Sequence, residues 1–158
     1  MYTTLLHQYQ LVISSREAVF NYLDTLKPED LLKPVASFNN ESIGSLMIHS
    51  ADTYTSWLVN FARQESRPFS TADNYKDLAS MRSTFEQINL IVNDFLNHFK
   101  DALEVPLTLP KKEGVELTLS PLQLFTHVIT HEFHHKGQIM NMSRQLGYIP
   151  VDTDVIRG

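Results

Sequence analysis

The sequence has no cysteine, which excludes disulfide bridges, thiolate metal ligands and a cysteine nucleophile. Glycine occurs 5 times and proline 7 times among 158 residues, so few positions interrupt regular structure and long helices are favoured. Apolar runs are as short as Trp57-Leu58-Val59, far below the roughly 18 residues of a membrane-spanning helix. Gln8 and Gln10 stand where a signal peptide would be apolar. We therefore expect a cytoplasmic protein with no membrane partner.

Positive charge is also scarce. Lys and Arg total 13 against 18 Asp and Glu, which gives a formal net charge of −5, and no run of basic residues occurs. A protein that follows a phosphate backbone needs a concentrated positive stripe, so we expect no nucleic-acid partner. Apolar residues make up 42% of the chain and charged residues 20%, enough to bury one core. The length predicts a single domain over residues 1–158.

Apolar residues recur at steps of three and four along most of the chain, which is the pattern of amphipathic helices. Between residues 104 and 119 the period changes to two around Lys111-Lys112-Glu113-Gly114, which predicts a small hairpin or an extended crossover. The predicted helices span residues 4–26, 42–65, 78–99 and 121–146. The fold class is therefore all-α, a four-helix bundle with antiparallel packing and a hairpin or crossover before the last long helix.

The ends of the last helix carry clear signals. Ser120 precedes Pro121, and Gln123 lies at the third helical position, which is a capping box with proline at the first position. Gly147 offers a left-handed residue to end the helix, and Pro150 prevents its continuation.

Histidine is the residue type in this chain that could bind a metal or take part in catalysis. On a helical wheel, His131 and His135 lie within about 20° of the apolar position Leu124, so both rings should face the core. Buried imidazoles need hydrogen-bond partners or a metal ion, and either solution is open at this point. His49, on the second predicted helix, is the candidate third ligand. Two further histidines have no such arrangement and are expected at the surface: His7 and His98.

Residues 131–135 also read H-E-x-x-H, the zinc-protease pattern in which a glutamate activates water. The extended form of that motif would need glycine and histidine where the chain has Gln138 and Asn141. Glu132 is therefore expected to be a solvated carboxylate or a contact to the ligands, and less readily a catalytic base.

The segment from Leu124 to Ile139 resembles the last helix of the DinB family of damage-inducible four-helix bundles, which commonly reads H-x-x-x-H-x-x-H-H-R-G-Q. Lys136 stands where that pattern has arginine. Residues 44–49 with Trp57 resemble the family's histidine-bearing helix. Residues 146–150 resemble the segment that ends the family's last helix. The resemblance covers essentially the whole chain.

If the resemblance holds, the family's metal triad falls on His49, His131 and His135, and the metal is nickel or zinc. His127, His134 and Glu132 are then candidates for contacts to the ligands or to a substrate. Relatives in the wider superfamily are thiol-dependent enzymes, including bacillithiol S-transferases and mycothiol-dependent maleylpyruvate isomerase. Family members are often homodimers. A metal-dependent thiol S-transferase with a small-molecule substrate and a low-molecular-weight thiol as co-substrate is therefore the leading hypothesis.

Two alternatives remain at this stage. The first is a non-catalytic metal-binding stress protein, whose metal joins two helices. The second is a zinc hydrolase of the H-E-x-x-H type, with Glu132 as its base. Two further expectations follow: the aromatic residues Phe85, Phe95 and Phe99 exceed one core's needs and support a dimer, and metal affinity should fall as the pH drops through about 6.5.

Overall fold

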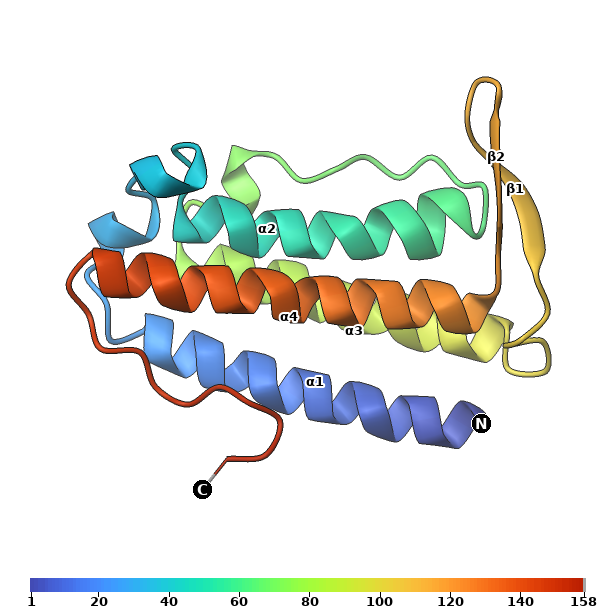
Figure 1. Cartoon of the computed structure of the whole chain (residues 1–158), viewed down its shortest axis with the longest axis horizontal. Helices are drawn as coiled ribbons and strands as arrows, with labels where there is room; N and C mark the ends of the chain where they lie inside the picture. The colour runs from blue at the N-terminus through green and yellow to red at the C-terminus, as the bar shows by residue number, and fades with distance from the viewer. Residues whose placement is uncertain (158) are drawn as a thin grey trace.

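The computed structural model describes residues 1–157 and contains four long helices and a two-stranded hairpin (Figure 1). The helices are α1 (Tyr2–Leu23), α2 (Ile43–Tyr54), α3 (Leu78–His98) and α4 (Pro121–Gln145). Strands β1 (Leu107–Lys112) and β2 (Val115–Leu119) pair antiparallel just before α4. The expected fold class is confirmed. Within residues 1–157, no helix has both the length and the apolar character to cross a bilayer.

The helices form two contacting layers rather than a simple up-and-down bundle. Both α1 and α2 pack against α3 and α4, so α1 and α2 lie diagonally opposite each other in the bundle. Figure 1 shows α2 and α3 running in the same direction, because the segment of residues 62–77 returns along the length of the bundle. Uniform antiparallel packing was therefore wrong for this pair. The long crossover matters because it passes over the face that carries His49.

The second predicted helix is wider in its last part than an α-helix. After Tyr54 the chain continues as the π-helical segment η3 (Thr55–Phe61), and Ala62 N–H donates to the Trp57 carbonyl five residues earlier, at 3.1 Å. Wider turns of this kind are rare and occur often at functional sites. Periodicity alone does not predict the change, because apolar residues continue through both segments.

The hairpin and the ends of α4 follow the sequence signals. Ser120 Oγ accepts from Gln123 N–H, and Ser120 N–H donates to Gln123 Oε1, as a capping box requires. Gly147 has φ +95°, a left-handed conformation that suits glycine and ends the helix. The predicted boundaries of α4 are thus confirmed.

Side chains from all four helices fill one core. The aromatic residues of α3 belong to it, because Phe85, Phe95 and Phe99 are each at most 8% exposed. They are therefore packed within a single chain, and their number gives no support for a dimer. Other large side chains without solvent contact include Tyr9, Phe20, Tyr54 and Phe125.

The C-terminal segment follows the bundle instead of leaving it, and runs along α1 (Figure 1). Thr153 is buried, and its carbonyl accepts from Ser15 Oγ at 2.6 Å and from Lys136 Nζ at 2.7 Å. Lys136 Nζ also lies 3.8 Å from the nearer Asp154 carboxylate oxygen. Lys136, where the family pattern has arginine, thus fastens this segment to α4 and α1.

Candidate metal centre

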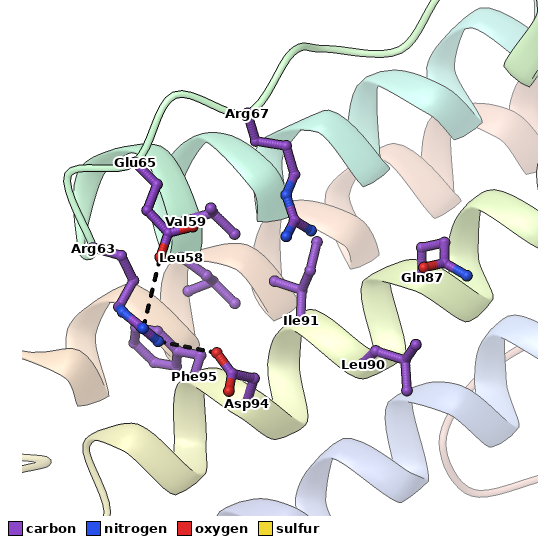
Figure 2. Close-up of a pocket in the computed structure, with 10 residues that line it drawn as sticks. All are labelled: Leu58, Val59, Arg63, Glu65, Arg67, Gln87, Leu90, Ile91, Asp94 and Phe95. Carbon is purple, nitrogen blue, oxygen red and sulfur yellow. Dashed lines mark hydrogen bonds and ion pairs between the residues drawn. The ribbon is translucent and has the colours of Figure 1, made fainter.

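One hollow of about 240 Å³ lies between η3 and α3 (Figure 2). Its Arg63 lies 3.6 Å from Glu65 and 3.0 Å from Asp94, and apolar side chains such as Ile91 and Phe95 line the rest. No histidine lines this hollow among residues 1–157. The chemistry indicated by the sequence therefore lies on another face.

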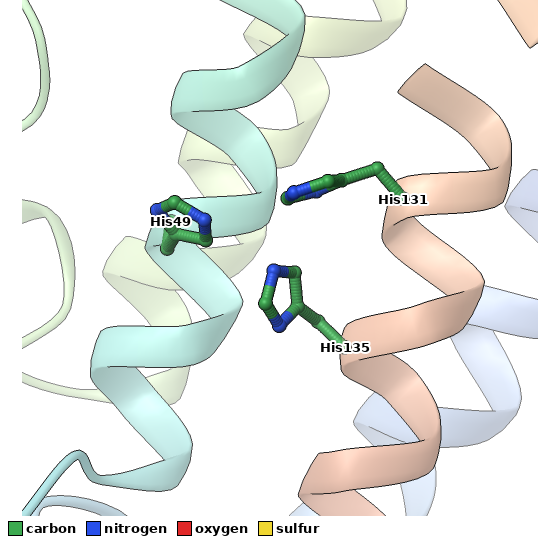
Figure 3. Close-up of side chains that lie close together, drawn as sticks. All are labelled: His49, His131 and His135. Atoms are coloured by element: carbon green, nitrogen blue, oxygen red, sulfur yellow. The ribbon is translucent and has the colours of Figure 1, made fainter. Parts of the chain in front are cut away.

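Three histidines meet between α2 and α4 (Figure 3). His131 and His135 project from adjacent turns of α4, because a spacing of four residues brings side chains onto the same helix face. His49 faces them from α2. The centroid of the His49 ring lies 5.3 Å from that of His131 and 4.8 Å from that of His135. The centroids of the His131 and His135 rings lie 4.4 Å apart. One nitrogen from each ring lies within 4.8 Å of the others.

Two nitrogens of this triad are buried without a partner: Nδ1 of His131 and Nε2 of His135. Leaving a buried polar atom unpaired costs about 1–3 kcal/mol, so native structures rarely contain two such atoms side by side. A cation held between the three rings would give both nitrogens a partner. The residues present therefore fit a bound metal ion.

The orientation of the His135 ring also fits a bound metal ion. Its Nδ1 lies 2.6 Å from Oε1 of Gln138, one turn further along α4. Because that oxygen is an acceptor, Nδ1 carries the proton and Nε2 keeps its lone pair toward the other histidines. Metal-binding histidines commonly have this arrangement, in which a neighbour fixes the ring and its tautomer.

Burial keeps the α4 histidines neutral. It lowers the pKa of His131 to about 4, helped by the positive charge that its neighbours His135 and His49 would carry. Burial also lowers the pKa of His135, although its hydrogen bond to Gln138 acts in the opposite direction. Neutral imidazole is the form that binds metal, so these two rings are ready to coordinate near pH 7.

The triad opens onto a cleft of about 440 Å³. His49 and His131 reach its surface, whereas His135 lies beneath and is 8% exposed. Small-molecule sites commonly have volumes of about 300–1,000 Å³, so a compact ligand could enter. The cleft is lined by His49, Asp52, Thr53, Ser56, Trp57, Phe69 and His131.

The remaining histidines take three different positions. His127 packs edge-on against Trp57, with ring centroids 5.1 Å apart, and burial together with the charge of Lys111 lowers its pKa. His134 is exposed, with its ring 5.0 Å from that of His135. His7 and His98 are exposed and away from the triad, as the sequence predicts.

Glu132 differs most from its expected role. It is 8% exposed instead of solvated, and its two oxygens accept from Arg16 Nε at 2.7 Å and Nη2 at 2.8 Å. Tyr54 also donates to this carboxylate. A carboxylate held inside the bundle in this way is not placed to activate water beside the triad.

Arg16 is the residue that the sequence reasoning missed. It also donates to Asn89 Oδ1 at 2.8 Å, and Tyr9 donates to the same oxygen, so the network joins all four helices. Burial alone would lower the pKa of Arg16, but the charge and hydrogen bond of Glu132, together with Tyr9 and Tyr54, outweigh burial and hold that pKa above its usual value. A signal existed, because Arg16 lies on the apolar stripe of the first helix and a charge there needs a buried partner.

Comparison with known proteins agrees with the family resemblance seen in the sequence. The model of the DinB family matches residues 1–158. The chain is 28% identical over 142 residues to uncharacterized protein YizA of Bacillus subtilis (strain 168), covering 89% of this chain and 87% of that protein. It is 24% identical over 153 residues to protein DinB of the same strain, covering 92% and 88%.

Proposed function

This chain belongs to the DinB family, and on that premise we propose that it binds one zinc or nickel ion through His49, His131 and His135. The observation that carries the proposal is the pair of buried, unpartnered nitrogens on α4, facing a third imidazole from α2. Three neutral nitrogen ligands suit borderline ions such as zinc and nickel far better than calcium or magnesium.

We further propose that the protein is a thiol S-transferase. A metal held by three histidines would keep positions free for other ligands and would lower the pKa of a thiol or a water bound there. The chain has no cysteine, so the thiol must be a second substrate, such as bacillithiol. Its sulfur would form a new bond to the carbon of a small electrophile as the leaving group departs. His127 and His134 flank the ligands and are candidates for substrate contacts.

A non-catalytic role is the second candidate, because the triad bridges α2 and α4 and a metal would join the two helices. We do not favour a zinc hydrolase. Its base would have to be Glu132, whose carboxylate is held by Arg16 and Tyr54.

The experiment combines metal replacement with a thiol-transfer assay. Untagged protein is stripped with a chelator, reloaded with zinc or nickel, and assayed with bacillithiol and 1-chloro-2,4-dinitrobenzene by absorbance. Turnover that needs the metal and is lost in His131→Ala supports the transferase. Metal-dependent stability without turnover for a panel of electrophiles would favour the non-catalytic role.

A homodimer is also proposed, on the family resemblance alone. Light scattering at micromolar concentration tests it, and a mass near 18.2 kDa would contradict it.

A further inference from the structure

The cleft above the triad has two aromatic walls. Trp57 belongs to η3, and Phe69 belongs to the crossover of residues 62–77. Phe69 is 54% exposed, so its phenyl ring can contact a molecule that enters the cleft. Together Trp57 and Phe69 give the cleft two aromatic surfaces, which suit a ligand with an apolar body.

Contacts around the cleft hold the Trp57 ring and the backbone next to Phe69. Lys111 of the hairpin places its Nζ 3.9 Å from the centre of the Trp57 ring, and His127 packs against the ring edge. On the other side, Ser70 donates from its backbone N and its Oγ to Asp52 Oδ1, at 3.0 and 2.8 Å, which anchors the residue next to Phe69. Walls fixed before binding lose little conformational freedom when a ligand enters.

An anionic head group is favoured by the proposed metal and not by the side chains that line the cleft, where the charged residue is Asp52. Asp52 is the acidic residue among the described residues that line it, and one of its oxygens already accepts twice from Ser70. Lys111 brings a positive charge to the Trp57 side. A metal at the triad would add further positive charge at the floor.

We propose that this cleft binds a compact ligand with a flat aromatic body and an anionic, metal-binding head, whose ring lies between Trp57 and Phe69 and whose head reaches the histidine triad. This inference rests on the proposed metal site and specifies its substrate class. An aromatic ring is favoured over an aliphatic body because paired aromatic rings attract each other beyond the gain from the apolar area that they bury.

The test uses three hydroxamates, which share one metal-binding head and differ in their bodies. Benzohydroxamate, cyclohexanecarbohydroxamate and acetohydroxamate are titrated calorimetrically into zinc-loaded protein. We expect benzohydroxamate to bind about tenfold more tightly than acetohydroxamate, with the cyclohexane compound between them.

Two matched variants locate the effect. In the Phe69→Ser variant, benzohydroxamate should lose most of its higher affinity over acetohydroxamate, while the protein should still bind zinc. Leu90→Ser, which alters a side chain 62% exposed on α3 outside the cleft, should leave the advantage unchanged.

Equal affinity of the three compounds for zinc-loaded protein would overturn the inference and leave the metal site standing. Affinity of the cyclohexane compound equal to or above that of benzohydroxamate would overturn the aromatic preference, as would an unchanged advantage in Phe69→Ser. Failure of the protein to take up zinc would instead overturn the proposed function, and with it this inference.

Discussion

Two neighbouring positions on α4 carry polar side chains into the bundle with opposite outcomes. Both oxygens of Glu132 have partners, supplied by α1 and α2. His131, the preceding residue, keeps a buried nitrogen without one, and so does His135 one turn later. The same helix therefore contains a polar group that the protein satisfies itself and two that it does not.

This difference distinguishes a polar group that stabilises the fold from polar groups that are left to bind a ligand. A polar network whose members are all paired stabilises the arrangement of the helices and needs nothing from outside. Unpaired nitrogens that converge below an open cleft are costly unless a ligand occupies them. Within H-E-x-x-H, the two histidines thus belong to the triad below the cleft, whereas Glu132 belongs to an ion pair inside the bundle.

The largest expected effect comes from breaking the internal pair. Arg16→Met leaves Glu132 buried without its cation, which should lower the free energy of unfolding by about 3–5 kcal/mol. Urea denaturation of chelator-treated protein measures this without a contribution from metal. The double variant Arg16→Met with Glu132→Leu should recover much of the loss, since neither charge then remains buried. A loss below about 1 kcal/mol in the single variant would show that the network is not a structural element.

A smaller effect, on metal affinity, is expected from removing the hydrogen bond that orients His135. Gln138→Ala removes the acceptor that holds His135, and loss of such a partner typically weakens metal binding by about 10- to 100-fold. Competition with a chromophoric chelator measures the affinity. Gln145→Ala, at an exposed position of the same helix, is the control and should not change it. Equal affinities for both variants would mean that Gln138 does not orient the ring.

The pH dependence sharpens the comparison further. Because burial lowers the folded-state pKa of His131 to about 4, the unfolded chain takes up a proton near pH 6.5 that the folded protein does not. The metal-free protein should lose stability as the pH falls from about 6.5 to 4, and this residue should contribute no change above that range. Urea denaturation across pH measures it.

The same pKa of His131 bears on the sequence-based expectation that metal affinity falls as the pH drops through about 6.5. Protons compete for the His131 ligand only near pH 4, so half-release should lie below pH 6.5 and not at it. Equilibrium dialysis from pH 7.5 to 4 follows the bound metal. Half-release at or above pH 6.5 would contradict the account.

The smallest effects are expected at the flanking histidines. His134 is exposed and His127 packs on Trp57, so alanine at either position should leave metal content unchanged. His134→Ala is the sharper case, because His134 adjoins His135 in the sequence. Loss of metal in either variant would require a different ligand set.

Much of this arrangement could be predicted from the sequence because it depends on local periodicity. The wheel predicted that His131 and His135 share one face of α4, although of the two His135 alone is buried and His131 lines the cleft. The capping signals at Ser120 and Gly147 gave the ends of the helix. Three features could not be predicted locally, since each joins segments far apart in the chain. They are the pairing of Arg16 with Glu132, the course of the crossover that carries Phe69, and the stacking of Lys111 on Trp57.

The most direct test of the central claim is the metal content of untagged protein, measured by mass spectrometry for the wild type and for alanine variants at His49, His131 and His135. The account predicts about one equivalent of zinc or nickel in the wild type and a large loss in each variant, with the fold retained by circular dichroism. Stoichiometric metal in His131→Ala or His135→Ala would contradict the site. Retention in His49→Ala alone would leave the α4 pair and require another third ligand, such as His127.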